Sequence, residues 1–478
     1  MKDESCLPEE IKSLIPELID FSDTKTVKEL ILKLFNVIEE FAQTIDQLQG
    51  EIQFLKDINN KLKGEKTKPR FKPSVPNKES EPPKQPTDKK QWDKDSRNDK
   101  IKIDREEEIK IDRSTLPSDA IHKGYREVII QNIKLSTDNV RFLLERFYSP
   151  GKDKLYEASL PSYLKGSQFG PELKSFIHFL FFKGRVTEPK LHGLLDDIGI
   201  VISEGQISNI LTQENAVFTQ EKQEVFETGM EQAGYFNTDD TGARHKGQNW
   251  YTHVFCSLFF TAFFIRKHKN RDTVEELLNI SGDNWKKKIM VSDDARQFLT
   301  LTEIQALCWM HETRHYRKLN PILDYHKSVL RDFLSEIWAY YYTLLQYKKC
   351  PDKWNKEFLR AWFNKIFSRK TGYAELDKRI ESTLGNKDRL LVVIDYPGIP
   401  LHNNDAELAV REPVIKRNIS HGTRSEAGRI SWENMLSLSD TCRKLDISFY
   451  KYLNDRFSGR NEIAPLANII EEKAVGCS

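Results

Sequence analysis

The sequence predicts an α/β protein of several domains, in which a core of mixed strands and helices follows a coiled coil and a small helical domain. Three observations support this prediction. A heptad repeat near the N-terminus ends in a stretch rich in Pro and Lys, strand-like apolar runs cluster in the middle of the chain, and a long helix-rich block follows them. The 478 residues are enough for roughly two to four domains with more than one core.

The heptad repeat covers residues 27–63, within an N-terminal helical region 1–64. Its two seam positions are occupied almost entirely by apolar residues: Ile31, Ile38, Ile45, Ile52 and Asn59 at one, and Leu34, Phe41, Leu48, Leu55 and Leu62 at the other. β-Branched residues at the first position and leucine at the second favour a parallel two-stranded coiled coil. We therefore expect a homodimer or higher oligomer, with an amphipathic helix packed on its own domain as the alternative.

Residues 65–115 are rich in Pro and Lys and nearly free of aliphatic residues over most of their length. Such a composition cannot bury enough surface to fold, which predicts a disordered basic linker. The linker either adds salt-sensitive affinity for phosphates or is a spacer without a partner. Residues 116–165 contain short strand-like runs and predict a small β module.

Residues 166–228 predict a helical domain. Two helices, over 172–183 and 188–197, are joined by a short segment, and Ser203 can cap a third helix after the turn at Gly199. This arrangement suggests a helix-turn-helix that binds DNA. A small helical bundle without DNA contact produces the same pattern, so both interpretations stay open.

The core is predicted over residues 229–311 and 396–445. Three strands with a hairpin turn at KGQN are followed by a helix, a short strand and, much later, another helix. This order resembles an RNase-H-like fold. Residues 312–395 are rich in long helices and predict an insertion into that fold, and residues 446–478 are expected to form a C-terminal tail.

Three carboxylates end or face elements that can bring them together. Asp239 ends a strand-like run, Asp293 follows a second short apolar run, and Glu407 lies at the start of a helix. Three such groups can hold two divalent ions, because Mg²⁺ prefers oxygen ligands and paired ions support displacement at phosphorus. Each carboxylate also has a simpler interpretation. Asp239 could cap a turn, Asp293 could be the N-cap of a helix beginning at Ala295, and Glu407 could form an ion pair with Arg411.

At these residues the chain resembles the DDE transposases of the insertion-sequence-66 type, a likeness that covers most of residues 160–460. The third motif is the most specific part. The matching segments are Asp239-Asp240-Thr241, Ser292-Asp293, Cys308-Trp309 with His311 and Arg314, Asn403-Asn404 with Glu407 and Arg411, and Lys416-Arg417-Asn418.

The resemblance implies metal-dependent cleavage and strand transfer of a mobile DNA element, with two Mg²⁺ or Mn²⁺ ions. Asp239 and Asp293 would hold the metals and Glu407 would complete the second site. DNA, at the element ends and the target, is the implied partner. The implied phosphate contacts are Arg411, Lys416 and Arg417, with His311 and Arg314 as further candidates for which core packing is the alternative. An RNase-H-like nuclease without strand transfer and a non-catalytic DNA-binding regulator are the rival functions.

The chain departs from the family pattern at three places. It has no cysteine between Cys6 and Cys256, where family members commonly carry a zinc-binding segment, and no zinc is expected as a cofactor. Asp240 replaces the usual glutamate, which leaves open whether Asp239 or Asp240 is the first metal ligand. His402 stands where the family often has aspartate.

Scattered cysteines without a C-x-x-C pair predict reduced thiols. The chain lacks an apolar run of the ~20 residues that span a bilayer, and its acidic N-terminus does not resemble a signal peptide. We therefore expect no membrane partner and a cytoplasmic location in a bacterium, with association to the nucleoid during activity.

Overall fold

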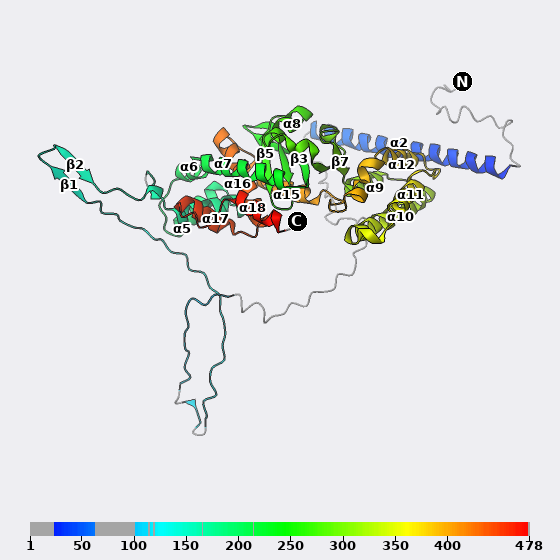
Figure 1. Ribbon diagram of the computed structural model, residues 1–478. Helices are drawn as coiled ribbons and strands as arrows, with labels where there is room; N and C mark the ends of the chain where they lie inside the picture. The colour runs from blue at the N-terminus through cyan, green and yellow to red at the C-terminus, as the bar shows by residue number, and fades with distance from the viewer. Residues whose placement is uncertain are drawn as a thin grey trace.

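A five-stranded mixed sheet lies at the centre of the computed structural model, which describes residues 23–62, 101–112, 115–117, 120–164, 166–213 and 215–476 (Figure 1). The spatial order of the strands is β5-β4-β3-β6-β7. The first three strands pair antiparallel, and β6 and β7 extend the sheet in parallel with β3. The strands are β3 (Tyr235–His245), β4 (Gln248–Cys256), β5 (Thr261–Arg266), β6 (Ile289–Ser292) and β7 (Ile304–Leu307).

The predicted hairpin turn is present between β3 and β4. Lys246 and Gly247 are its two central residues, and both have positive φ, at 49° and 77°. Two positive φ values are typical of a type I′ turn, whose twist matches that of the flanking strands. The hairpin therefore continues β3 well beyond Asp239, a point that shapes the surface beside the site.

The edge strand β5 is covered by α16 (Glu426–Lys444). The β5 backbone N–H groups of Thr261, Phe263 and Ile265 donate to side chains of that helix over 3.1, 2.8 and 2.8 Å. An unpaired edge is a template for association with other strands, and side-chain acceptors remove that hazard. The outer edge of β5 is therefore not available for pairing with another strand.

The helices of the predicted helical domain and the helices at the C-terminus share one hydrophobic core with the sheet (Figure 1). Ser203 caps its helix as predicted, since its Oγ accepts from Gln206 N over 3.2 Å. The residues expected as a C-terminal tail form two helices that pack on α4 and α7, so the tail prediction missed their burial. These helices are α4 (Pro171–His178), continued by a π-helical turn η6 (Phe179–Lys183), α5 (Glu188–Asp197), α6 (Glu204–Gln213), α7 (Asn215–Gln232), α17 (Phe449–Ser458) and α18 (Leu466–Val475). In addition, α8 (Arg271–Asn279) joins β5 to β6.

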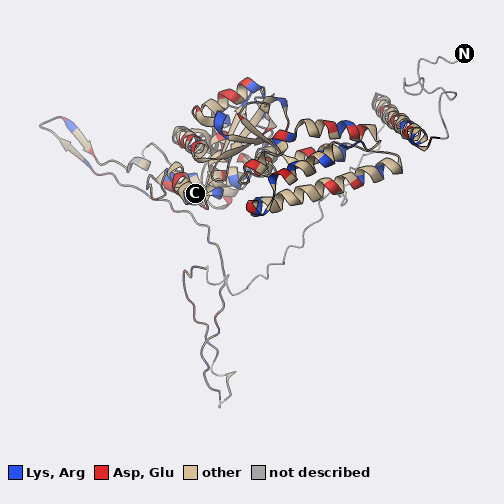
Figure 2. Ribbon diagram, turned by 45° about the vertical axis from the view of Figure 1, so that its right-hand side comes forward, with Lys and Arg blue, Asp and Glu red and all other residues tan. Residues whose placement is uncertain are grey.

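A second core holds together the helix-rich block between β7 and α15 (Asn404–Ser420). Trp309 is 1% exposed and donates to Leu390 O over 3.0 Å, so it is a core residue. Figure 2 shows both signs of charge spread over these helices. They are α9 (Trp309–Lys318), α10 (Asp324–Lys349), α11 (Lys356–Phe367), α12 (Ala374–Gly385), α13 (Lys387–Leu390) and α14 (Val392–Asp395).

The heptad repeat forms one helix of 39 residues, α2 (Thr24–Leu62), which lies along the helix-rich block (Figure 1). Glu39 is 2% exposed, and its carboxylate accepts from Leu323 N over 3.0 Å and contacts His326 Nδ1 at 3.1 Å. Asn36 donates to Gly372 O over 2.9 Å and accepts from Ala374 N over 2.9 Å. One face of α2 is therefore docked on its own chain, as the alternative interpretation of the repeat required.

The opposite face of α2 is the heptad seam. Its apolar residues are between 39% and 63% exposed: Ile31, Leu34, Ile38, Phe41, Ile45, Leu48, Ile52 and Leu55. The side chains of Asn59 and Leu62 lie outside the described residues, as does Lys63. The same helix is thus docked on its own chain by one face (cis docking) and exposes the heptad seam on the other.

Within residues 116–165, the described regular strands are the hairpin β1 (Arg146–Ser149) and β2 (Lys154–Glu157), which projects from the folded body (Figure 1). Most of the predicted linker, residues 65–100 and 113–114, lies outside the described residues. Among the described helices, none is long and apolar enough to cross a membrane.

Candidate active site

The register of two parallel strands brings the first two carboxylates together. Asn237 of β3 pairs with Val291 of β6. Asp239 and Asp293 each follow two residues later, so they lie at neighbouring positions and on the same face, because neighbouring strands are about 4.8 Å apart and side chains alternate with period two. Besides burial, the charge of Asp293 raises the pKa of Asp239, and a cation beside the two groups would relieve this repulsion.

The helix that carries Glu407 is fixed to the same strand by Asn403, the residue before α15. The Asn403 side chain is fully buried, accepts from Asn237 Nδ2 over 2.9 Å and donates to Thr238 O over 2.7 Å. Asn237 and Asp239 point to the same face of β3, so α15 lies over the face that carries Asp239. Packing of Val254 and Phe263 against Ala406 and Ala409 holds the helix there.

The electrostatics of the cluster agree with this proximity. Burial raises the pKa of the Asp239 carboxyl to about 7, and the negative charges of Asp293, Asp240 and Glu407 act in the same direction. Burial also raises the pKa of Asp293. A divalent cation would reverse both shifts, because an opposite charge within a few ångströms favours the ionised form.

The choice between Asp239 and Asp240 has a structural basis. Both Asp240 oxygens are engaged, with Lys269 Nζ at 3.3 Å and Gln297 Nε2 at 2.6 Å. Asp239 makes only a local bond, from Asp240 N to its Oδ1 over 2.8 Å. Asp240 therefore has charge and hydrogen-bond partners of its own on the other face of β3, while Asp239 faces the cluster.

The simple interpretation of Asp293 is also partly present. Its Oδ1 accepts from Ala295 N over 3.1 Å, ahead of the short 3₁₀ turn η8 (Arg296–Phe298). Only one oxygen is used in this turn, so the other is available to a ligand. A turn cap and a metal ligand are compatible roles for this side chain.

Glu407 is surrounded by residues of α9. Its Oε2 accepts from Arg314 Nη2 over 2.9 Å, and its Oε1 lies 3.5 Å from His311 Nδ1. Arg314 also donates to His311 Nε2 over 3.1 Å. Both Glu407 Oε1 and His311 Nδ1 are buried without a hydrogen-bond partner. Buried polar atoms without partners need an explanation, and a bound ion or water between these two would provide one.

The donor set fits hard divalent cations. Three carboxylates supply the oxygen ligands that Mg²⁺ and Mn²⁺ prefer, and Glu407 Oε1 is an unpaired acceptor. The raised pKa of Asp239 is the expected state of such a cluster when no cation neutralises it.

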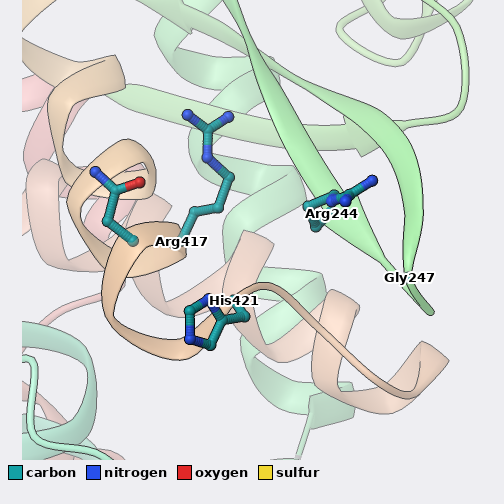
Figure 3. A pocket seen from close by; sticks show the side chains of 5 residues that line it. Arg244, Gly247, Arg417 and His421 are labelled. Carbon is teal, nitrogen blue, oxygen red and sulfur yellow. The ribbon is translucent and has the colours of Figure 1, made fainter. Parts of the chain in front are cut away.

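An open pocket of about 630 Å³ lies at the far end of β3, between the hairpin tip and the end of α15 (Figure 3). Arg244 reaches it from the strand, and Arg417 and His421 reach it from the helix (Figure 3). Gly422 has φ of 104°, and a Cβ there would lie 2.3 Å from Arg244 O, so only glycine permits this approach. Cations from two elements thus share one basin, which suits an anionic ligand.

The predicted phosphate contacts differ in their positions. Arg411 is exposed, and Arg417 lines the basin while donating to Gly242 O. Lys416 requires a correction: it is 3% exposed, and its Nζ donates to Phe181 O over 2.7 Å and lies 3.5 Å from the ring centroid of Phe181. Burial lowers the Lys416 pKa to about 7. This side chain supports the π-helical turn of the neighbouring domain and is not available to DNA.

Sequence reasoning missed Arg244, His421 and the partners of Asp240. Arg244 is five positions after Asp239 on a strand, and its odd spacing gave no periodic signal. His421 follows the last helical residue of α15 with a left-handed φ of 58°. The Lys416-Arg417-Asn418 segment was the one sequence feature that pointed to the basin, since Arg417 and Asn418 line it. Lys416 points away from the basin, toward Phe181. Asp395 ends α14 and pairs with Arg360 at 2.7 Å.

Two comparisons bear on these residues. The model of the family described as "Transposase IS66 family" matches residues 166–430, which is more than half of the chain and includes all three carboxylates. A protein of Sinorhizobium fredii (strain NBRC 101917 / NGR234), described as "Uncharacterized protein y4jO", is 40% identical over 187 residues, covering 39% of this chain and 58% of that protein. The chain thus matches somewhat over half the length of that relative.

Proposed function

The chain belongs to the IS66 transposase family, and from this premise we propose that it cleaves and transfers DNA strands of a mobile element with divalent metal ions. The observation that carries the proposal is the strand register that puts Asp239 and Asp293 at neighbouring positions, with the helix of Glu407 fixed to the strand of Asp239 by Asn403. The strand order β5-β4-β3-β6-β7, with α15 over one face, supports an RNase-H-like core.

In this proposal Asp239 and Asp293 hold the metal ions and Glu407 completes the second set of ligands. Bound ions would activate the attacking oxygen and stabilise the leaving oxygen at phosphorus. Asn403 keeps Glu407 in line with Asp239, and Arg314 holds the Glu407 carboxylate in place before the ions bind. Asp240 anchors Gln297 and Lys269 and has no direct role in the reaction.

We propose that the DNA strand runs from the carboxylates along β3 to the basin at Arg244 and Arg417. Asp239 and Arg244 are roughly 16 Å apart along the strand, a distance that a few nucleotides of a DNA strand can span. Arg411, exposed on α15, lies between the two sites along the helix. Contacts to phosphate fix the strand's position without reading its sequence.

A homodimer through α2 fits a reaction that must join two ends of one element. The exposed seam supplies the apolar surface for a parallel coiled coil, while the docked face connects α2 to the helix-rich block. Each catalytic unit would then be tied rigidly to the dimer axis.

A cleavage and joining assay tests the function. Labelled DNA with the element's ends is incubated with the full chain and Mg²⁺ or Mn²⁺, alongside a pre-cut end with a free 3′-hydroxyl. We expect nicking and joining that Glu407→Gln abolishes while DNA binding stays. Hydrolysis without joining would identify a nuclease of the same fold, and DNA binding with no metal-dependent cleavage would identify a regulator.

A further inference from the structure

Beside the three carboxylates lies a second group of potential ligands with a different chemistry. Cys308, His311 and Glu407 each offer one atom to a common centre, and these atoms all lie within 4.8 Å of one another. Among the described residues, this is the group of metal-ligand side chains found close enough together to share one ion. A thiol and an imidazole are not ligands that Mg²⁺ selects.

The second observation is the set of orphaned atoms. His311 Nδ1 and Glu407 Oε1 are buried, lie 3.5 Å apart and have no hydrogen-bond partner. In a tetrahedral zinc site the ligand atoms are about 3.5 Å apart, so this pair already has the required separation. The sulfur needs to approach by roughly 1 Å at most.

Backbone N–H groups surround the sulfur, although the pKa of the thiol is raised on balance. Cys308 immediately precedes α9, and its Sγ accepts from Asn403 N over 3.2 Å. Burial raises the pKa of the thiol, whereas the backbone N–H groups of His311, Asn403 and Met310 lower it. Backbone donors around a sulfur stabilise a thiolate that coordinates metal, as hydrogen bonds to the ligands do in known sites.

We propose that Cys308, His311 and Glu407 form a site for one thiophilic divalent cation, Zn²⁺ by its chemistry, that competes with the catalytic ions for Glu407. Three protein ligands leave a fourth position for water, which is typical of exchangeable zinc and not of a structural site. This proposal departs from the expectation, drawn from the sequence, that the chain binds no zinc. Binding stands on the geometry alone; the competition rests on the proposed function.

The proposal has a consequence for Arg314. Coordination through Nδ1 puts the ring proton of His311 on Nε2, which then cannot accept the bond that Arg314 now donates. Arg314 also occupies Glu407 Oε2. Arg314 therefore opposes the cation, and its removal should tighten binding.

The binding test uses Co²⁺ as a spectroscopic probe of the full chain. We expect a thiolate-to-cobalt charge-transfer band that Zn²⁺ removes, that Cys308→Ser abolishes, and that Arg314→Gln brings out at lower Co²⁺ concentration. Cys350→Ser is the matched control, since Cys350 is an exposed free thiol, and it should keep the band. Circular dichroism checks that each variant is folded, and His311→Gln supplies a second ligand variant should Cys308→Ser fail to fold.

Absence of the band in the wild-type chain, or a band of full strength in Cys308→Ser, overturns the site. Competition is tested separately by adding Zn²⁺ to Mg²⁺-supported cleavage. Cys308→Ser should raise the inhibitory Zn²⁺ concentration roughly tenfold or more. Unchanged inhibition in that variant overturns the competition. Loss of cleavage under every metal would instead contradict the proposed function and leave the cobalt result intact.

Discussion

Asn403 donates a hydrogen bond from Nδ2 to the carbonyl oxygen of Thr238 over 2.7 Å, directly before Asp239 in the chain. This bond joins the helix of the third carboxylate to the strand of the first. The residues are far apart in sequence, and the helix-rich block lies between them. The buried Asn403 side chain thus joins the two parts of the site, together with the packing of α15 on β4 and β5.

Asn403→Ala is expected to destabilise the protein and to impair cleavage. The substitution leaves Asn237 Nδ2 and Thr238 O buried without partners, which costs about 2 kcal/mol or more in the free energy of unfolding. Urea denaturation measures the stability, and the Mg²⁺ dependence of cleavage measures the loosened carboxylate. Asn404→Ala, at the exposed neighbouring position, is the control and should change neither. Equal effects at both positions would contradict the anchoring role.

Asp239→Asn is expected to stabilise the metal-free chain at neutral pH. The raised pKa means that the folded state holds a proton that the unfolded state releases, so stability falls as pH rises from about 4 to about 7. The shift corresponds to at most roughly 4 kcal/mol. Tm without metal should therefore rise in the variant at pH 8 and stay unchanged near pH 3.

The same substitution gives a complementary result with metal. Mg²⁺ or Mn²⁺ should raise the Tm of the wild-type chain, because ions that bind only the folded state stabilise it. The variant should gain little from the ions and should not cleave DNA. A variant that is less stable than wild type at every pH would show that Asp239 is a structural residue.

Arg244→Ala and Arg417→Ala are each expected to weaken DNA binding and to reduce its salt dependence. Each lost phosphate contact lowers the slope of log K against log salt by about 1. Fluorescence anisotropy over a salt series measures both quantities. Arg331→Ala, an exposed arginine on α10, removes the same charge away from the basin and should leave the slope unchanged. Identical slopes in all three variants would exclude the basin from the DNA path.

Local patterns located the elements that carry the candidate carboxylates. The second apolar run ends where β6 ends, one residue before Asp293, whereas β3 continues to His245, well beyond Asp239. The parallel register of the two strands then puts Asp239 and Asp293 at neighbouring positions. The spacing of Asn403 and Glu407 placed the third carboxylate at the start of a helix. These signals lie within a few residues of each functional group.

Long-range contacts explain what could not be predicted. Lys416 has the sequence context of a phosphate ligand, but its ammonium group meets Phe181 O of a domain more than 200 positions away. Asp240 could not be separated from Asp239 because its partner Gln297 comes 57 residues later, after three further strands. The burial of the C-terminal helices likewise depends on surfaces of α4 and α7 that no local period records.

Ile38→Glu combined with Ile45→Glu is expected to convert a dimer of the full chain into monomers. Both residues lie on the seam, 48% and 56% exposed, where two glutamates per helix would meet two others across a coiled coil. They lie opposite the face that carries Asn36 and Glu39, so the docking of α2 on its own chain should persist. Sedimentation velocity measures the mass, and hydrogen exchange over α2 checks that the helix remains docked. Lys33→Glu, at an exposed position away from the seam, should leave the dimer intact. A wild-type chain that sediments as a monomer at all concentrations would refute the coiled-coil dimer and leave cis docking as the role of the repeat.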